Sequence, residues 1–292
     1  MVRFLTIQAL ALGLLVAPLF GGNDNNFTYL ALGDSIAFGY NPTLFPPYQP
    51  ASPVPTPGEF VGYPERVADF EHLLQSKKEV NAACPGETSG SFLTGTQDNG
   101  CQAFKAEIGL HTAYPGITQA RFAGSELASN KHINLVTLSI GGNDLLLLQQ
   151  QCVNSILGFT GCVEKYLPGV LNTYAGNLTL ILGGIRANYQ GTLILMKSYA
   201  PSADPLFVYA IEQLNAVMVT VANTPHANFD VKFADGFTAF QIASAIFQHD
   251  PCKAGLLIRL SKPFDPLSCD VHPSPIGRDV LAATVLIANG YK

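Results

Sequence analysis

The chain has 292 residues, of which 48% are hydrophobic, which is enough to enclose a full core. Its 16 Lys and Arg against 21 Asp and Glu give a net charge of -5, and no basic cluster stands out, which argues against nucleic acid as a partner. Only 13% of the residues are charged, below the roughly 25% of an average soluble domain, so neutral polar side chains must hydrate much of the surface, as suits an extracellular protein.

The first 22 residues have the features of a secretory signal peptide. Arg3 precedes an apolar stretch, 4–20, that Gln8 interrupts and that is marginal for spanning a bilayer. The exit of this stretch lacks a clean cleavage pattern, so an uncleaved N-terminal anchor is the alternative. We expect the segment to be removed and residues 23–292 to form a single domain of a secreted protein.

Strand-like and helical segments alternate along the chain. Five strands are predicted, at Phe27–Leu32, Glu79–Cys84, Asn134–Ile140, Thr192–Lys197 and Asn228–Ala234. Helices are predicted at Tyr63–Gln75 and Asn172–Asn188, and a last helix is capped by Ser274 and ends at Asn289-Gly290. Strands that alternate with helices indicate a parallel sheet covered by helices.

Residues 41–58 contain seven prolines, too many for a helix or a central strand. We predict an extended loop inside the domain. It either shapes a substrate cleft or is a solvated excursion without a role.

The six cysteines fall into three local couples. We predict three disulfides, which join Cys84 to Cys101, Cys152 to Cys162, and Cys252 to Cys269. Each would close a short loop, for which the chain-entropy estimate is about 3 kcal/mol. Buried free thiols are the alternative, and the absence of a Cys-x-x-Cys or His pair at ligand spacing makes a zinc site a weaker one.

Four polar motifs follow predicted strands or precede the last helix. Ligands collect outside the carboxyl ends of the strands of an open parallel sheet, so these motifs are predicted to meet at one edge. The motifs are Gly33-Asp34-Ser35-Ile36, Pro85-Gly86, Gly141-Gly142-Asn143-Asp144 and Asp270-Val271-His272-Pro273.

The residue types in these motifs are those that ester chemistry requires. A serine hydroxyl is a weak nucleophile unless an imidazole takes its proton, so Ser35 and His272 matter only if the fold brings them together. Attack on an ester carbonyl creates an oxyanion, for which the backbone N–H groups of Ser35 and Gly86 and the side-chain amide of Asn143 are candidate donors. The alternatives are structural: Gly86 and Asn143 would be plain turn residues, and Asp144 would be the N-cap of the next helix.

The order and spacing of the four motifs resemble the blocks of the SGNH (GDSL-type) hydrolase superfamily, over most of the chain. The resemblance implies a three-layer α/β/α flavodoxin-like sandwich with a five-stranded parallel sheet. It also implies ester hydrolysis through a serine acyl-enzyme, with no metal or organic cofactor. In the family roles, Ser35 would be the nucleophile and first oxyanion donor, Gly86 and Asn143 the other donors, and His272 the base.

One position departs from the family pattern. That pattern usually has an acidic residue three positions before the histidine, where this chain has Cys269, and Asp270 lies only two positions before. Either Asp270 or a backbone carbonyl therefore orients the imidazole. A Cys252–Cys269 bridge would pin the loop that carries His272.

The segment 33–37 almost fits the Gly-x-Ser-x-Gly motif of a second serine hydrolase architecture, the α/β-hydrolases. The fifth position is Ala37, however, and Ser35 follows the first strand, which makes this interpretation minor.

The substrate is predicted from weaker signals. The chain has no Trp, the commonest sugar-stacking side chain, and leucines 145–148 are placed to border an acyl pocket beside Asn143, although a leucine run is more often plain core. These features favour lipid or other hydrophobic acyl esters, hydrolysed by a monomer in at most transient contact with a lipid surface. A carbohydrate O-acetyl esterase, an acyltransferase and a non-catalytic binding protein are the alternatives.

Overall fold

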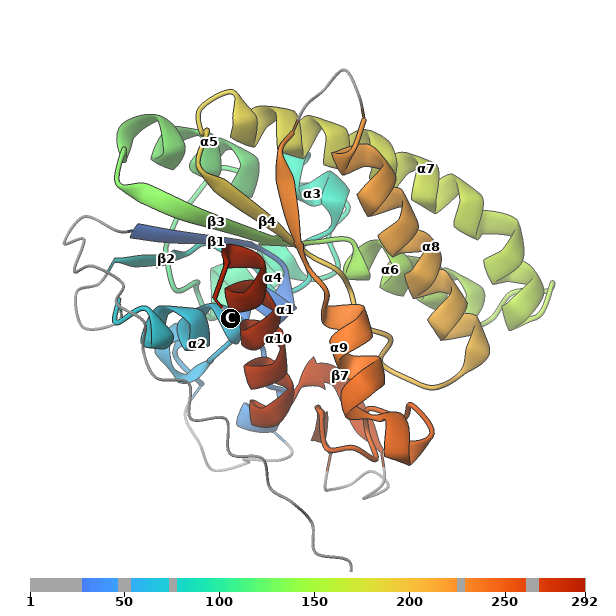
Figure 1. The fold of residues 1–292 in the computed structure, drawn as a ribbon. Helices are drawn as coiled ribbons and strands as arrows, with labels where there is room; N and C mark the ends of the chain where they lie inside the picture. Colours follow the sequence, from blue (N-terminus) through green and yellow to red (C-terminus); the bar gives the residue numbers. More distant parts are fainter. Residues whose placement is uncertain (1–27, 47–53, 74–77, 225–228, 261–267, 292) are drawn as a thin grey trace, which may run out of the picture.

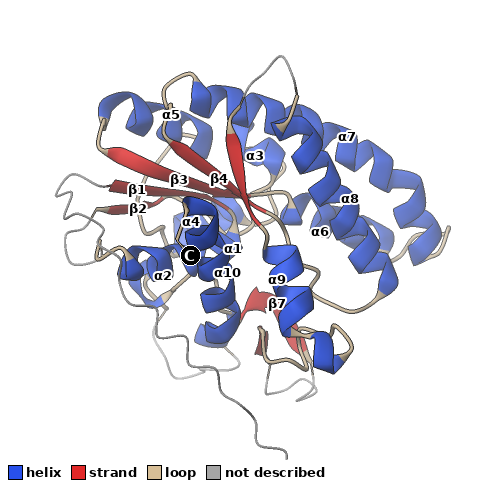
Figure 2. Ribbon diagram, viewed as in Figure 1, coloured by secondary structure: helices blue, strands red, loops and turns tan. Residues whose placement is uncertain are grey.

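A five-stranded parallel sheet lies at the centre of the molecule (Figures 1 and 2). The computed structural model describes residues 28–46, 54–73, 78–224, 229–260 and 268–291, so the predicted signal peptide, 1–22, lies outside the described residues. The strands have the order β2-β1-β3-β4-β5, which is the flavodoxin-like order and confirms the predicted fold class. They are β1 (Thr28–Gly33), β2 (Glu79–Asn81), β3 (Ile133–Ser139), β4 (Thr192–Met196) and β5 (Val231–Ala234).

The central strands are buried on both faces, which explains their continuous apolar sequences. All six residues of β1 are buried, and Leu30 pairs with Val136 of β3. Two buried hydroxyl groups on these strands form a hydrogen bond with each other: the Tyr29 hydroxyl lies 2.7 Å from Oγ1 of Thr137.

Helices cover both faces of the sheet (Figure 1). Helices α2 (Tyr63–Phe70) and α10 (Pro275–Asn289) pack side by side on one face, and α5 (Gln119–Ser129), α7 (Phe159–Arg186) and α8 (Pro205–Ala222) lie on the other. Five further α-helices are described: α1 (Ser35–Phe38), α3 (Ser89–Thr94), α4 (Cys101–Glu107), α6 (Gly142–Cys152) and α9 (Gly236–Ala243).

Helix α8 is the one described helix long and apolar enough to cross a membrane by length and composition. It packs against α7 and buries Leu214 and Met218 completely in the core. These two residues belong to the hydrophobic core, while 39% of the helix as a whole is buried.

The last helix is as predicted. The hydroxyl of Ser274 accepts the N–H of Gly277 at 3.2 Å, Pro275 occupies the first turn, and Gly290 ends the helix in the left-handed conformation. These caps place the start of α10 directly behind His272.

Several predicted boundaries differ from the structure, among them the start of β5, which is Val231 and not Asn228. Helix α7 starts at Phe159, 13 residues before the predicted start, and runs through Pro168, because Val163 and Leu167 extend its buried stripe. Strand β2 ends at Asn81, after which the chain still follows β1 through separate backbone bonds. Helix α2 ends at Phe70 instead of Gln75, and residue 75 lies outside the described residues.

A second, two-stranded sheet was not predicted. Strands β6 (Leu257–Arg259) and β7 (Cys269–Pro273) pair antiparallel below the main sheet (Figure 2). Both strands are short and partly polar, so neither has the apolar alternation that predicts a strand. This small sheet carries Asp270 and His272.

The described ends of the proline-rich segment form two short 3-10 turns, Pro42–Leu44 and Pro57–Glu59. Residues 47–53 lie outside the described residues. Proline suits the first position of such turns because it has no N–H that needs a partner there.

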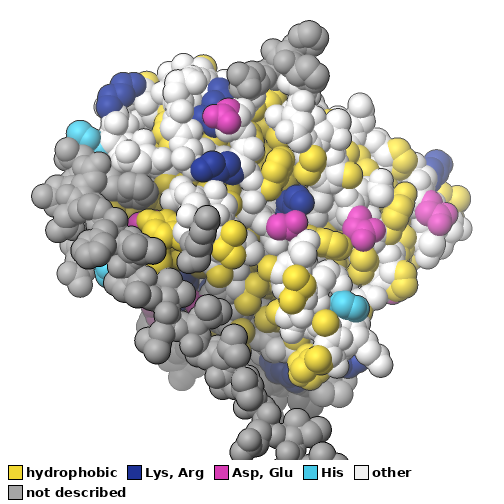
Figure 3. Space-filling view, viewed as in Figure 1, with side chains coloured by type: hydrophobic (Ala, Val, Ile, Leu, Met, Phe, Trp, Pro, Cys, Tyr) yellow, Lys and Arg dark blue, Asp and Glu magenta, His cyan; other side chains and the backbone are white. Residues whose placement is uncertain are grey.

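All three predicted disulfides are present, joining Cys84 to Cys101, Cys152 to Cys162, and Cys252 to Cys269. The face shown in Figure 3 carries few charged groups among many neutral and hydrophobic atoms, in keeping with the low charged fraction.

Candidate active site

Ser35 lies on a tight turn between β1 and α1. Gly33 has a φ of 128°, and a Cβ there would lie 1.9 Å from the carbonyl oxygen of Ser139, so only glycine lets β1 end this close to β3. The Asp34 carboxylate then caps α1 by accepting the N–H of Ile36 at 3.0 Å. Ser35 is therefore the first residue of α1, where its own N–H has no helical partner.

His272 reaches Ser35 from strand β7. Its Nε2 lies 2.8 Å from the Ser35 hydroxyl oxygen, although the two residues are 237 positions apart in the sequence. The ring of Tyr40 packs against the imidazole with the ring centroids 4.8 Å apart. The fold thus brings together the two residues that the sequence singled out, at a distance that permits proton transfer.

Asp270 contacts His272 twice. Its Oδ1 accepts a hydrogen bond from the ring Nδ1 and another from the backbone N–H of His272, the latter at 3.0 Å. Burial acts to raise the pKa of Asp270, but the hydrogen bonds and charge of His272 outweigh it and hold that pKa below its usual value. An ionised carboxylate at Nδ1 orients the ring so that Nε2 faces Ser35.

Two contacts fix the strand that carries this pair. The hydroxyl of Tyr199 donates to the carbonyl of Val271 at 2.6 Å. The disulfide from Cys252 joins the first residue of β7, Cys269, as the sequence predicted.

Three donors are available to a developing oxyanion. Gly86 has a φ of 83°, and a Cβ there would lie 2.2 Å from the carbonyl oxygen of Asn99. Within the described part of the chain, the backbone N–H groups of Ser35 and Gly86 donate to no protein acceptor. The buried Asn143 amide donates to the Glu87 carbonyl at 3.0 Å, which leaves its second N–H for a ligand.

The alternative interpretation of Asp144 as an N-cap is wrong. Helix α6 begins at Gly142 with Gly141 as its cap, so Asp144 falls within the first turn. Its carboxylate instead accepts the N–H of Ser89 at 2.9 Å and the Ser89 hydroxyl at 2.6 Å. Asp144 therefore tethers α6 to α3, the helix that follows the Gly86 turn.

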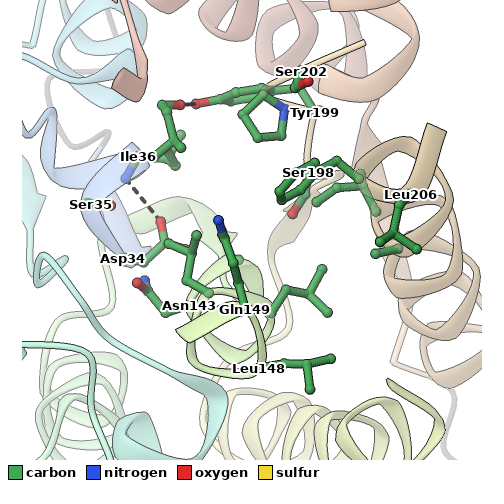
Figure 4. Close-up of a pocket in the computed structure, with 18 of the residues that line it drawn as sticks. Asp34, Ser35, Ile36, Asn143, Leu148, Gln149, Ser198, Tyr199, Ser202 and Leu206 are labelled. Carbon is green, nitrogen blue, oxygen red and sulfur yellow. Dashed lines mark hydrogen bonds between the residues drawn. The ribbon is translucent and has the colours of Figure 1, made fainter. Parts of the chain in front are cut away.

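A cavity of about 290 Å³ opens at Ser35 and extends between α6, α7 and α8. Figure 4 shows Ser35 and Asn143 on one side of this space and Leu206 across it. Polar groups stand at the serine end, and the walls are mainly apolar: Leu145, Leu146, Leu148, Phe159, Val163, Leu206, Phe207 and Ala210. Three of the four leucines 145–148 thus line the cavity.

Asp34 also lines the cavity, directly under the serine turn. Burial raises its pKa to about 7, although the hydrogen bonds from the Ile36 N–H and the Ser139 hydroxyl act in the opposite direction.

Several residues at the site were missed by the sequence analysis. Tyr40 is only five positions after Ser35, and an aromatic residue so near a candidate nucleophile could have been noted. Phe159 and Val163 belong to the part of α7 that precedes Pro168, where the proline masked the helical pattern. Tyr199 and Gln119 have no local signal, because only the fold brings them to the site.

One cluster among the described residues has metal-ligand types close together. The sulfurs of Cys84 and Cys101 and the carboxylate of Glu87 lie within 4.8 Å of one another. Both sulfurs form a disulfide, so neither is the thiolate that a metal would need.

Solved structures with the same fold include enzymes with different substrates. The acetylxylan esterase of Geobacillus stearothermophilus matches with a TM-score of 0.53 and 17% identity, over 91% of this chain and 95% of that chain. Phospholipase A1 of Streptomyces albidoflavus NA297 matches with a TM-score of 0.56 and 18% identity, over 91% and 99%. A lipase from a goat rumen metagenome matches with a TM-score of 0.52 and 18% identity, over 91% and 98%. Curated proteins gave no match.

Residues 31–280 match the model of the GDSL-like lipase/acylhydrolase family, which covers all four motifs. Fold and family together define a hydrolase that acts on ester bonds. The chain belongs to the GDSL-like lipase/acylhydrolase family.

Proposed function

We propose that the protein is a secreted serine esterase of lipase type, which hydrolyses esters of hydrophobic acyl groups through an acyl-enzyme on Ser35. One observation carries the proposal. The Ser35 hydroxyl oxygen, 2.8 Å from His272 Nε2, lies at the mouth of the largely apolar 290 Å³ cavity.

The geometry supports a two-stage acyl transfer. Ser35 Oγ attacks the ester carbonyl carbon while His272 Nε2 takes the hydroxyl proton. The negative carbonyl oxygen is held by the N–H groups of Ser35 and Gly86 and by the Asn143 amide. His272 then returns the proton to the departing alcohol. Water attacks the acyl-enzyme in the same way and His272 again accepts a proton. His272 then passes that proton to Ser35 Oγ as the bond from Oγ to the acyl carbon breaks, which restores Ser35 and releases the carboxylic acid.

The cavity is the basis for the proposed substrate. Its volume is close to the roughly 300 Å³ lower bound of small-molecule sites, and its walls are chiefly Leu, Phe, Val and Ala side chains. An acetyl group would leave most of this apolar surface in contact with water, whereas an aliphatic acyl chain would cover it, at about 25 cal/mol per Å² buried. A carbohydrate O-acetyl esterase is the second candidate, because the fold is shared with an acetylxylan esterase.

Acyl chain-length profiles test this proposal. Wild-type protein should hydrolyse p-nitrophenyl octanoate with a higher kcat/KM than the acetate. Ala210→Phe, which fills the cavity, should shift the preference toward short chains, while Ala216→Phe, on the exposed side of the same helix, should not. Activity confined to acetate would favour the carbohydrate esterase. Transfer of the acyl group to added alcohols in preference to water would identify a transferase. A lack of any turnover would favour a non-catalytic binding protein.

We also propose transient contact with a lipid surface. The loop closed by the Cys152–Cys162 disulfide exposes Ile156 fully and Val153 by 62%, and it contains no charged residue. Phe159, from the same loop, lines the cavity, so the exposed apolar tip is continuous with the acyl site. Ile156→Ser should reduce activity on emulsified triacylglycerol and spare activity on dissolved ester, whereas Ile287→Ser, at a residue that is 68% exposed on α10, should affect neither.

Secretion is supported by the three disulfides, since such bonds persist in oxidising compartments. Detection of the processed protein outside cells that express the full chain tests it. Retention of an intact N-terminus in the membrane fraction would favour the uncleaved anchor.

A further inference from the structure

A buried polar pair lies beside the oxyanion donors and takes no part in the proton transfer. Gln119 begins α5, yet it is only 1% exposed, and Glu87, which follows Gly86, is 2% exposed. Nε2 of Gln119 donates to Oε2 of Glu87 at 3.0 Å. Polar side chains are buried this deeply when their hydrogen-bonding groups are satisfied, so their partners indicate their role.

The Gln119 amide pairs with both backbone groups of Gly33. Its Oε1 accepts the Gly33 N–H at 2.6 Å, and its Nε2 donates to the Gly33 carbonyl at 3.0 Å. The Gly33 carbonyl also accepts the Cys84 N–H at 3.0 Å from the chain that follows β2, whereas the Gly33 N–H has the Gln119 amide as its partner. Gly33 precedes Ser35 by two residues, so Gln119 fixes the strand end that leads into the serine turn.

Glu87 connects this strand end to the other two donors. Its backbone carbonyl accepts the Asn143 amide at 3.0 Å, and its own peptide follows Gly86 directly. The carboxylate is fixed at both oxygens, because Oε1 accepts the hydroxyl of Ser91 at 2.5 Å while Oε2 accepts Gln119.

We propose that Gln119 and Glu87 are positioning residues that hold the donors of Ser35, Gly86 and Asn143 at the spacing an oxyanion requires. The three donors come from three separate segments of the chain. The Gln119–Glu87 pair is hydrogen-bonded to Gly33, two residues before Ser35, and to Asn143, and Glu87 is joined to Gly86 by their peptide bond. Donors lower the barrier only when they are already aimed at the position where charge develops, so a link of this kind acts on the transition state. The inference rests on the proposed function, since it concerns the same reaction.

The chemistry of the pair selects the variants. Gln119→Met keeps a similar volume but leaves the Gly33 N–H and Glu87 Oε2 without this partner. Glu87→Leu removes both acceptors, whereas Glu87→Gln keeps an oxygen for Gln119 and an amide that can donate to the Ser91 hydroxyl. If Gln119→Met does not fold, Gln119→Glu replaces it, since it keeps the shape but sets a carboxylate against Glu87.

The test combines turnover of p-nitrophenyl butyrate with inhibition by butylboronic acid, which binds Ser35 as a tetrahedral adduct with an oxygen in the oxyanion position. Gln119→Met and Glu87→Leu should lower kcat by about tenfold or more, change KM by less than about threefold, and weaken the inhibition by a factor similar to the loss of kcat. Glu87→Gln should restore kcat and inhibition to within about threefold of wild type.

Asn215→Leu is the matched control. The Asn215 amide accepts the Ser198 N–H at 2.9 Å and donates to the Ser198 carbonyl at 2.8 Å, the same paired contact just after β4, on a residue that lines the cavity but supplies no oxyanion donor. It should lower the unfolding midpoint as Gln119→Met does and leave boronic acid inhibition unchanged. If butylboronic acid inhibited the Gln119→Met and Asn215→Leu variants equally well, the positioning role would be overturned. A wild-type turnover that Ser35→Ala does not abolish would overturn the proposed function instead.

Discussion

Oδ1 of Asp270 accepts both the ring Nδ1–H and the backbone N–H of His272. Both residues lie on strand β7, where side chains two positions apart point to the same face. The spacing of two, which departs from the family pattern, therefore still places the carboxylate at the imidazole.

Asp270→Asn should lower kcat by about a hundredfold to ten-thousandfold, because an amide can hold Nδ1 in the wrong tautomer. The steady-state rate on p-nitrophenyl butyrate measures this loss. The unfolding midpoint of the variant serves as the control for folding. A loss of less than about fivefold would show that another group orients His272.

Asn143→Ala should lower kcat by about a hundredfold to a thousandfold with little change in KM, since the amide contributes most when the oxyanion forms. Steady-state kinetics of the variant and wild type measure how the loss of activity divides between kcat and KM. Gln149→Ala, which changes a cavity residue on the same helix, provides the comparison for α6. A rise in KM with unchanged kcat would mean that Asn143 binds the ground state and not the oxyanion.

Glu79 makes stability depend on pH. Burial, and then the charge of Glu65, raise the pKa of Glu79 to about 9, and its Oε1 has no hydrogen-bond partner among the described residues. The pKa of Glu79 in the folded protein lies above its unfolded value of about 4.3. The contribution of Glu79 to the free energy of unfolding is therefore fully present below about pH 4.3 and is lost as the pH rises through about 9.

Glu79→Gln should therefore flatten the fall in the unfolding midpoint between about pH 5 and pH 9, and its advantage over wild type should grow with pH. Thermal unfolding followed by circular dichroism across this range measures the effect. Parallel curves for the two proteins would contradict it.

The Cys252–Cys269 disulfide should open first under mild reduction. Both of its cysteines are partly exposed, whereas the other four are buried. Opening this bridge releases β7, so esterase activity should fall while the main sheet stays folded, at a cost in unfolding free energy of about 3 kcal/mol. Mass spectrometry of alkylated thiols, sampled together with activity and far-UV circular dichroism, follows the two events. Full activity in protein with only this bridge open would show that β7 is held without it.

The sequence predicted the parts of the fold that leave a local signal. Five apolar strands, the caps at Ser274 and Gly290 and the cysteine couples are each readable within a few residues, and the carboxyl-edge rule placed Ser35, Gly86 and Asn143 together. The rest depends on tertiary contacts. Strand β7 exists through its pairing with β6.

The interpretations of individual side chains show the same division. Asp144 looked like a helix cap because that is its commonest local role, but Gly141 starts α6 earlier and the Asp144 carboxylate reaches Ser89 on α3. Gln119 gives no signal at all, since its partner Gly33 is 86 positions away. Local chemistry identified the reacting groups, and only the fold identified what holds them.

The most direct test of the central claim is intact-mass measurement after treatment with a fluorophosphonate. Wild-type protein should gain one adduct and lose ester hydrolysis in step with labelling, and His272→Ala should label far more slowly, because the imidazole accepts the hydroxyl proton. Ser35→Ala should gain none. An adduct of equal yield on Ser35→Ala, or ester hydrolysis that survives the loss of this hydroxyl, would contradict the assignment of Ser35 as the nucleophile.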